Sequence, residues 1–173
     1  LSVIIPLTLV GMFILLYATF GKFRQAGLVL SIVPLALFGG MLALNVRGMT
    51  LNVSSAVGFI AMFGLSIQNG IIMVSQINGL RIKGMELRKS VIEGALQRFR
   101  PILMTSVTTI LGLFPASLAT GIGSDVQRPL ATVIVYGLMF STLVSMFLLP
   151  AFYYLVENNV LNKKKNDEKE YTL

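Results

Sequence analysis

The sequence predicts an all-α membrane protein with five transmembrane helices, and its composition is the first observation behind this prediction. Of the 173 residues, 55% are hydrophobic and only 12% are charged, whereas about a quarter of the residues of a soluble domain are charged. The mean hydropathy is +0.81. A soluble fold of this size cannot bury so much apolar surface, so we expect the chain to be solvated by lipid.

The second observation is the spacing of the apolar segments. An α-helix needs about 20 apolar residues to cross the hydrocarbon core of a bilayer. Five segments reach this length or approach it, and none of them contains Asp, Glu, Lys or Arg. The expected spans are residues 1–20, 27–46, 53–77, 102–120 and 130–155.

The third observation is the distribution of positive charge between the spans. Twelve of the 14 Lys and Arg residues lie in the first connection, the third connection and the C-terminal tail, while the other two connections contain only Arg47 and Arg128. The positive-inside rule places the basic side in the cytoplasm. We therefore expect the start of the chain outside and its C-terminus inside. Contact with membrane lipid accounts for the net charge of +7, so no nucleic-acid partner is predicted.

The third connection and the tail carry further structure predictions. Apolar residues of the segment 85–99 fall on one broad helical face, which predicts a short amphipathic helix on the inner membrane surface. The alternative is a connector that only orients the spans. The polar, lysine-rich segment 157–173 is expected to be a disordered cytoplasmic tail. Because the chain starts at Leu1, inside an apolar run, we interpret it as a piece of a longer protein.

Polar residues inside the spans are the candidate functional groups, because polar groups in lipid are costly unless they face protein or water. Adjacent amides, Gln68 and Asn69, lie in the third span, and a face of the fourth span carries Thr105, Thr108 and Thr109. One interpretation is hydrogen bonding that holds helices together. The other is a hydrated path between helices. Neither amide titrates near neutral pH, so these groups can position protons but not carry them.

Several function classes lack the residues they need. The chain has no Cys and no His, and it shows no nucleophile–base pair, phosphate loop or nucleotide fingerprint. Its seven acidic residues all lie outside the expected spans. We therefore predict that the chain is not an enzyme and binds no cofactor. The sequence identifies no metal ligands, and the nine Met residues are interpreted as packing residues.

Three long strings resemble the resistance-nodulation-division (RND) transporters. They are VGFIAMFGLSIQNGIIMVSQINGLR from Val57, RFRPILMTSVTTILGLFPASLATGIGSDVQRPLATVIVYGL from Arg98, and LLPAFYYL from Leu148. Members of this family have twelve spans in two similar halves, each interrupted by a large periplasmic domain after its first span. The resemblance implies that this chain covers spans eight to twelve, because the first half would carry the proton-binding aspartates where this chain has Gln68 and Asn69.

The resemblance also implies which residues act. The strings SIQNG and VQRPLATV are similar to the heavy-metal efflux branch. Drug-efflux members often have a lysine at the position of Gln68. It lies next to an asparagine that corresponds to Asn69. Thr105 matches a threonine of the family's relay region, and Arg98 matches an arginine at the cytoplasmic end of that region. These four residues would form a polar path that orients carboxylates supplied by the missing half.

The implied function is proton-driven efflux of heavy-metal cations across the bacterial inner membrane. The implied partners are the missing N-terminal half, two further copies in a trimer, a periplasmic adaptor and an outer-membrane channel. Two alternatives remain at this point. One is an RND exporter of drugs or other hydrophobic compounds, and the other is a truncated membrane fragment that does not transport.

Overall fold

The structure is a computed structural model that describes residues 4–170, with side chains described for residue 7 and residues 10–161. The described part of the chain is all-helical, which confirms the predicted fold class. Its helices are α1 (Ile4–Phe20), α2 (Phe23–Leu30), α3 (Ile32–Val46), α4 (Val53–Ile82), α5 (Leu87–Leu118) and α6 (Ser124–Glu170).

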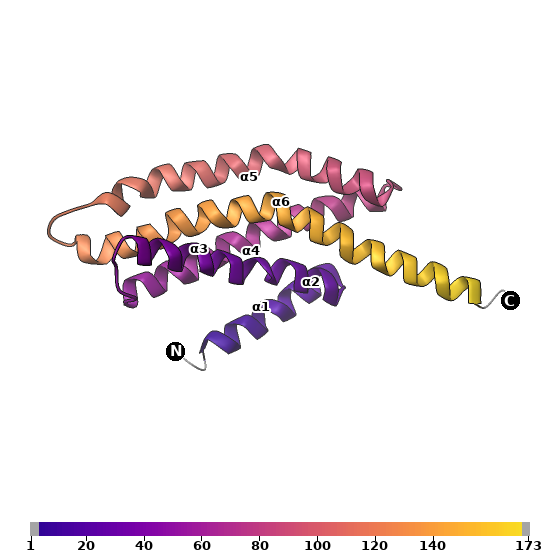
Figure 1. Cartoon of the computed structure of the whole chain (residues 1–173), viewed down its shortest axis with the longest axis horizontal. Helices are drawn as coiled ribbons and strands as arrows, with labels where there is room; N and C mark the ends of the chain where they lie inside the picture. The colour runs from indigo at the N-terminus through magenta and orange to yellow at the C-terminus, as the bar shows by residue number, and fades with distance from the viewer. Residues whose placement is uncertain (1–3, 171–173) are drawn as a thin grey trace.

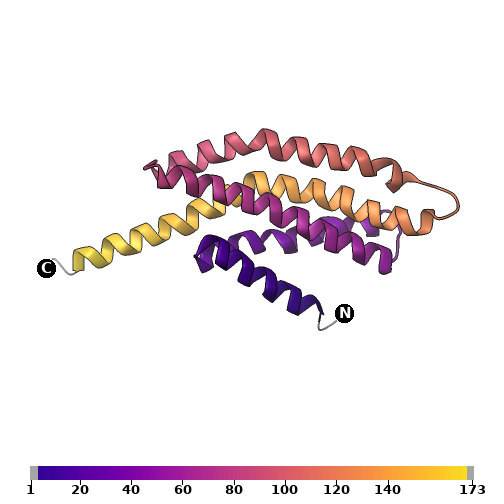
Figure 2. The ribbon, with the colours of Figure 1, turned by 180° about the vertical axis from the view of Figure 1, so that it is seen from behind.

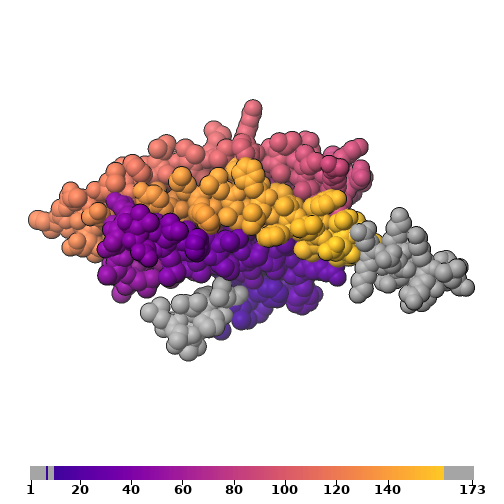
Figure 3. Space-filling view, viewed as in Figure 1, coloured from indigo at the N-terminus to yellow at the C-terminus, as the bar shows by residue number. Residues whose placement is uncertain are grey.

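Helix α6 is the centre of the bundle. It packs against α3, α4 and α5, whereas α1 packs mainly against α2 and splays away from the other helices (Figures 1 and 2). The space-filling view shows α6 lying between α5 and the α2–α3 segment (Figure 3). The middle of α6 is therefore buried between neighbouring helices, while much of α5 is exposed.

Four segments are long and apolar enough to cross a membrane: Phe23–Val46, Val53–Ile82, Leu87–Leu118 and Ser124–Leu161. The first expected span corresponds to α1, whose 17 residues rise about 25 Å at 1.5 Å per residue. The second expected span consists of α2 and α3, separated at Ser31. Pro34 explains the interruption, because its ring clashes with the carbonyl of the residue four positions earlier, Leu30.

The predicted surface helix at residues 85–99 is not a separate helix. It forms the first half of α5, which continues through Pro101 into the expected span at 102–120. Tertiary packing explains this difference: Leu87 and Val91 are buried in the core, and a Cβ added to Gly94 would lie 2.8 Å from the side chain of Ile77 on α4. These contacts hold the segment beside α4, while Ile92, Leu96 and Phe99 of its apolar face stay exposed.

The expected disorder of the tail also differs from the structure. Helix α6 runs on to Glu170, and residues 171–173 lie outside the described part of the chain. Between Ala151 and Glu170 the sequence contains no Gly or Pro. Leu, Lys and Glu are good helix formers, so nothing in this segment stops the helix that begins in the membrane span.

Helices α4 and α6 are locked in one parallel register. Ser141 Oγ donates to Ser66 Oγ over 2.7 Å, and Tyr153 OH donates to Asn78 Oδ1 over 2.6 Å, each across 75 residues of sequence. The glycine at position 58 allows this close approach, because a Cβ there would lie 2.9 Å from the backbone oxygen of Leu130. Helix α5 runs antiparallel to α6, with Ser106 and Thr142 hydrogen-bonded at 2.8 Å.

Candidate functional site

All four residues singled out from the sequence line one pocket. The pocket lies between α4 and α5, with Leu138 of α6 also in its wall, and has a volume of about 100 Å³. That volume is enough for several water molecules, and the pocket has the polar groups that buried water needs. Gln68 and Asn69 come from α4, while Arg98 and Thr105 come from α5.

The two amides occupy different positions in the wall of this α4–α5 pocket. Neighbouring residues of a helix point about 100° apart, because a turn contains 3.6 residues. Gln68 is exposed on the uncovered side of α4, whereas Asn69 is only 8% exposed. A pocket that wraps around this side of α4 therefore receives both amides, one at its mouth and one deeper inside.

Arg98 is held in place by an amide from the neighbouring helix. Its Nε and Nη2 both donate to Gln76 Oε1, at 3.2 and 2.9 Å. Gln76 Nε2 donates to Gln97 Oε1 at 2.6 Å, and Gln97 Nε2 donates to Glu93 Oε1 at 3.0 Å. This chain of hydrogen bonds ties the guanidinium to the α4 side of the pocket, with its charge left unpaired by any carboxylate among the described side chains.

Thr105 contributes a hydroxyl whose donor is already used within α5. Its Oγ1 donates to the backbone oxygens of Pro101 and Ile102, at 3.1 and 3.0 Å. A hydroxyl oxygen keeps acceptor lone pairs when it donates its hydrogen. Thr105 therefore offers the pocket an acceptor, which suits a water molecule or a protonated carboxyl group.

Two other hydroxyls of the polar faces hold helices together. Ser66 is fully buried and joins α4 to α6 through Ser141. Ser106, although it borders the pocket, is 3% exposed and joins α5 to α6 through Thr142. Thr108 and Thr109 instead bond to backbone oxygens one turn earlier in α5. The polar residues of the spans are thus divided among bonds between helices, bonds within one helix and the pocket.

The sequence analysis missed a second polar group, which we call the closed cluster: Gln25 of α2, Asn78 of α4 and Tyr153 of α6, with the ion pair Arg81–Glu157. Gln25 and Asn78 exchange two amide hydrogen bonds, at 2.9 and 2.7 Å. Gln25 and Tyr153 are almost completely buried. The ion pair closes one side, with 2.8 Å between Arg81 Nη1 and Glu157 Oε2. Each residue lies near the end of a span, and no sequence pattern indicates that these ends meet.

The chemistry of the α4–α5 pocket is that of fixed dipoles around one permanent positive charge. Amides and hydroxyls do not titrate near neutral pH, and arginine stays protonated. Within the part of the chain that the structure describes, no group of three or more His, Cys, Asp or Glu is arranged to hold a metal ion. The pocket is therefore suited to hold water and to bind a negatively charged group.

Long apolar helices and a polar pocket between two of them define a multi-pass α-helical membrane protein. A comparison with protein families identifies it further. The model of the AcrB/AcrD/AcrF family matches residues 1–157. The chain therefore belongs to this family of RND transporters.

Curated relatives and solved structures agree with the family. Protein HelA of Legionella pneumophila is 46% identical over 98% of this chain and 16% of its own length. The cobalt-zinc-cadmium resistance protein CzcA of Cupriavidus metallidurans is 44% identical over 90% of this chain and 15% of its own length. The chain is 54% identical to the crystal structure of a heavy metal efflux pump, with a TM-score of 0.81, over 90% of this chain and 16% of that one. The chain thus spans about one sixth of these relatives.

Proposed function

We propose that this chain forms the second-half membrane bundle of a proton-driven pump that exports heavy-metal cations. The names of its relatives support the cargo: one confers resistance to cobalt, zinc and cadmium, and another is a nickel and cobalt resistance protein that is 44% identical. The observation that carries the proposal is the α4–α5 pocket, in which Gln68, Asn69, Thr105 and Arg98 converge.

In this proposal the pocket receives a carboxylate of the missing N-terminal half. The guanidinium of Arg98 lies in the pocket wall, and a nearby positive charge favours the ionised form of a carboxyl group. Once that group is protonated, its O–H donates a hydrogen bond to Thr105 Oγ1, and the amides bind water around it. The two protonation states thus differ in their bonds to α4 and α5, which is the differential interaction that a conformational change requires.

The proposal extends to the assembly and its placement. The chain works with the N-terminal half, in a homotrimer, with a periplasmic adaptor and an outer-membrane channel. Its basic end faces the cytoplasm, as the positive-inside rule indicates. A cysteine introduced at Lys83 should then react with a reagent only from the cytoplasmic side, and one at Thr120 only from the outside. The reverse pattern, in a cysteine-free full pump, would contradict this orientation.

The decisive experiment replaces Gln68 and Asn69 by Leu in the full-length pump, in a strain without its own metal exporters. We expect normal expression, with loss of metal tolerance and of proton-coupled efflux. Ser141→Ala is the matched control, since it removes a polar bond of α4 outside the pocket. Efflux that survives the double substitution would show that the amides only pack. An equal loss of efflux in the Ser141→Ala variant would show that efflux depends on any polar contact of α4.

A further inference from the structure

A groove of about 440 Å³ runs along the outside of α5 and α6, away from the pocket. Its walls are mostly apolar, and Arg88 lies at its rim. The residues that line it are Arg88, Val91 and Ile92 of α5, and Pro150, Ala151 and Tyr154 of α6. The volume falls within the range of roughly 300–1,000 Å³ that is usual for small-molecule sites. An apolar ligand with a polar end matches this lining.

The register of the helices places this groove at the boundary of the hydrocarbon core. The last apolar stretch of α6 ends at Val156, and Glu157 pairs with Arg81 near the end of α4. The groove reaches α6 between Pro150 and Tyr154, within two turns of that ion pair. Ile92 and Leu96, on the neighbouring turns of α5, are 52% and 64% exposed, which is favourable only in contact with lipid or further protein. Arg88 thus stands one helical turn beyond the exposed Ile92, toward the basic end of the bundle.

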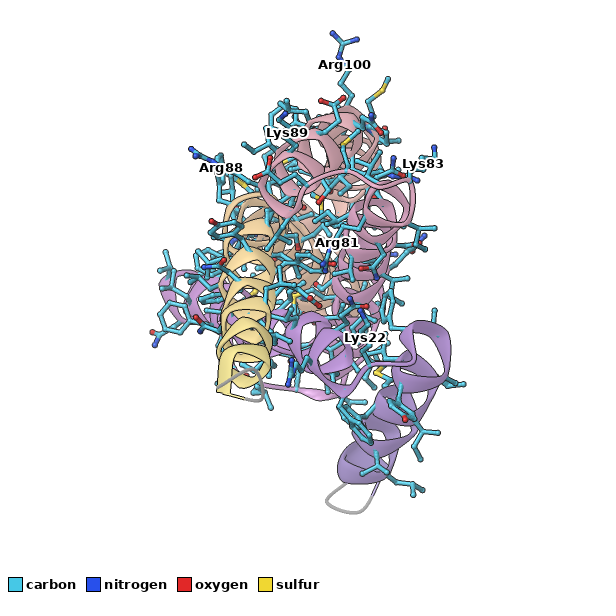
Figure 4. All side chains as sticks on the ribbon, turned by 90° about the vertical axis from the view of Figure 1, so that its right-hand side faces the viewer. Lys22, Arg81, Lys83, Arg88, Lys89 and Arg100 are labelled. Atoms are coloured by element: carbon cyan, nitrogen blue, oxygen red, sulfur yellow. The ribbon has the colours of Figure 1, made fainter. Side chains whose placement is uncertain are left out.

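The charge of Arg88 is not neutralised inside the bundle. Among the side chains of residues 10–161, the one ion pair is Arg81–Glu157, which occupies the middle of this end of the molecule. Arg88, Lys83 and Arg100 lie at its periphery (Figure 4). On the other flank of α6, a second groove has the same construction, with Arg24 above Leu28, Phe152 and Leu155.

We propose that the α5–α6 groove binds an anionic glycerophospholipid. Arg88 binds the phosphate with its planar donor groups, which match phosphate geometry, and an acyl chain lies on Val91, Ile92, Pro150 and Ala151. A basic pocket between transmembrane helices is a known form of site for anionic headgroups. The lipid fills a groove that the bundle leaves open and joins α5 to α6 at their basic end.

The test uses the full-length pump, purified in detergent and freed of lipid, and adds phosphatidylglycerol or phosphatidylcholine at equal concentration. Native mass spectrometry counts the bound lipids, and thermal unfolding reports stabilisation. We expect phosphatidylglycerol to be retained and to raise the Tm more than phosphatidylcholine does. Arg88→Gln should remove most of this difference. Lys89→Gln is the matched control, since it removes the same charge one residue away, outside the groove.

The outcomes separate the possible occupants. Equal losses in the Arg88→Gln and Lys89→Gln variants would overturn the site and leave only a general attraction to basic charge. A Tm rise with inorganic phosphate alone would assign Arg88 to a free anion. No preference between the two lipids would show that other parts of the pump cover the groove. None of these measurements depends on metal transport, so their failure is distinct from failure of the proposed function.

A second variant tests the apolar part of the groove. Ala151 is exposed, so Ala151→Phe adds a ring to the groove without entering the core. This variant should retain its Tm in detergent but lose bound phosphatidylglycerol, while Arg88 remains in place. Retention of the lipid in the Ala151→Phe variant would place its acyl chain elsewhere and overturn the proposed binding mode.

Discussion

Helix α4 carries two polar sites that differ in how their groups are satisfied. In the closed cluster, Asn78 bonds to Gln25 and Tyr153, and both of these partners are buried in the bundle. In the α4–α5 pocket, two turns or more away, the amides line a space of about 100 Å³ that is large enough for water. The same residue type thus serves packing at position 78 and is available to a ligand at position 69. The hydrogen-bond partners of an asparagine, rather than the residue type, therefore separate the two roles.

The largest expected effect is on the closed cluster. Asn78→Leu leaves the buried Oε1 of Gln25 without its donor and the hydroxyl of Tyr153 without its acceptor, and each unsatisfied group costs about 1–3 kcal/mol. We expect a loss of about 3 kcal/mol, seen as a clearly lower Tm of the purified full pump. Asn69→Leu is the control in the pocket and should change the Tm little. Similar Tm losses in both variants would erase the distinction between the two sites.

Substitutions in the ion pair of the closed cluster should lower the stability by a smaller amount, and the two partners should differ. The side chain of Glu157 is 9% exposed and that of Arg81 is 25% exposed. Arg81→Gln strands the more buried charge, so it should destabilise the protein more than Glu157→Gln does. A double-mutant cycle on the Tm-derived stability should give a coupling of about 1 kcal/mol. A coupling near zero would show that the pair is solvated and does not close the cluster.

Neighbouring residues of α5 provide a third comparison. Ser106→Ala breaks the buried bond to Thr142 and should cost about 1 kcal/mol of stability while efflux continues. Thr105→Val removes the acceptor in the pocket, so it should leave the Tm almost unchanged and lower proton-coupled efflux. The measurement pairs thermal unfolding with efflux for both variants. If Ser106→Ala is the variant that loses efflux, the functional group has been assigned to the wrong residue.

The smallest effect is expected at Gln76, which accepts two hydrogen bonds from Arg98. Gln76→Leu should change the stability by less than about 0.5 kcal/mol, because the half-buried guanidinium of Arg98 can turn to water. Efflux should fall only a few-fold, since Arg98 keeps its charge but loses its fixed position. Efflux as low as in Arg98→Ala would show that Gln76 itself belongs to the pocket chemistry.

The sequence predicted the fold class and the convergence of the pocket residues better than it predicted helix ends. Composition and charge spacing identify membrane helices because lipid imposes a strict length and polarity. The first half of α5 was misplaced because its apolar face suits both a membrane surface and a neighbouring helix, and only the contact of Gly94 with Ile77 decides between them. Gln25 and Tyr153 gave no signal, since their pairing depends on the register of α2 and α6 against α4.

That register limits how the bundle can move. Helix α6 is attached to α4 on both sides of Pro150, through Ser141 on one side and through Tyr153 and Glu157 on the other, at offsets of 75, 75 and 76 residues. A sliding step of one helical turn, about 5.4 Å, would break every attachment at once. Pro150 removes one backbone bond from α6, and the helix changes direction along its length (Figure 1). The two helices are therefore held in one register on both sides of Pro150. Helix α6 can bend at this proline, but it cannot slide along α4 by one turn.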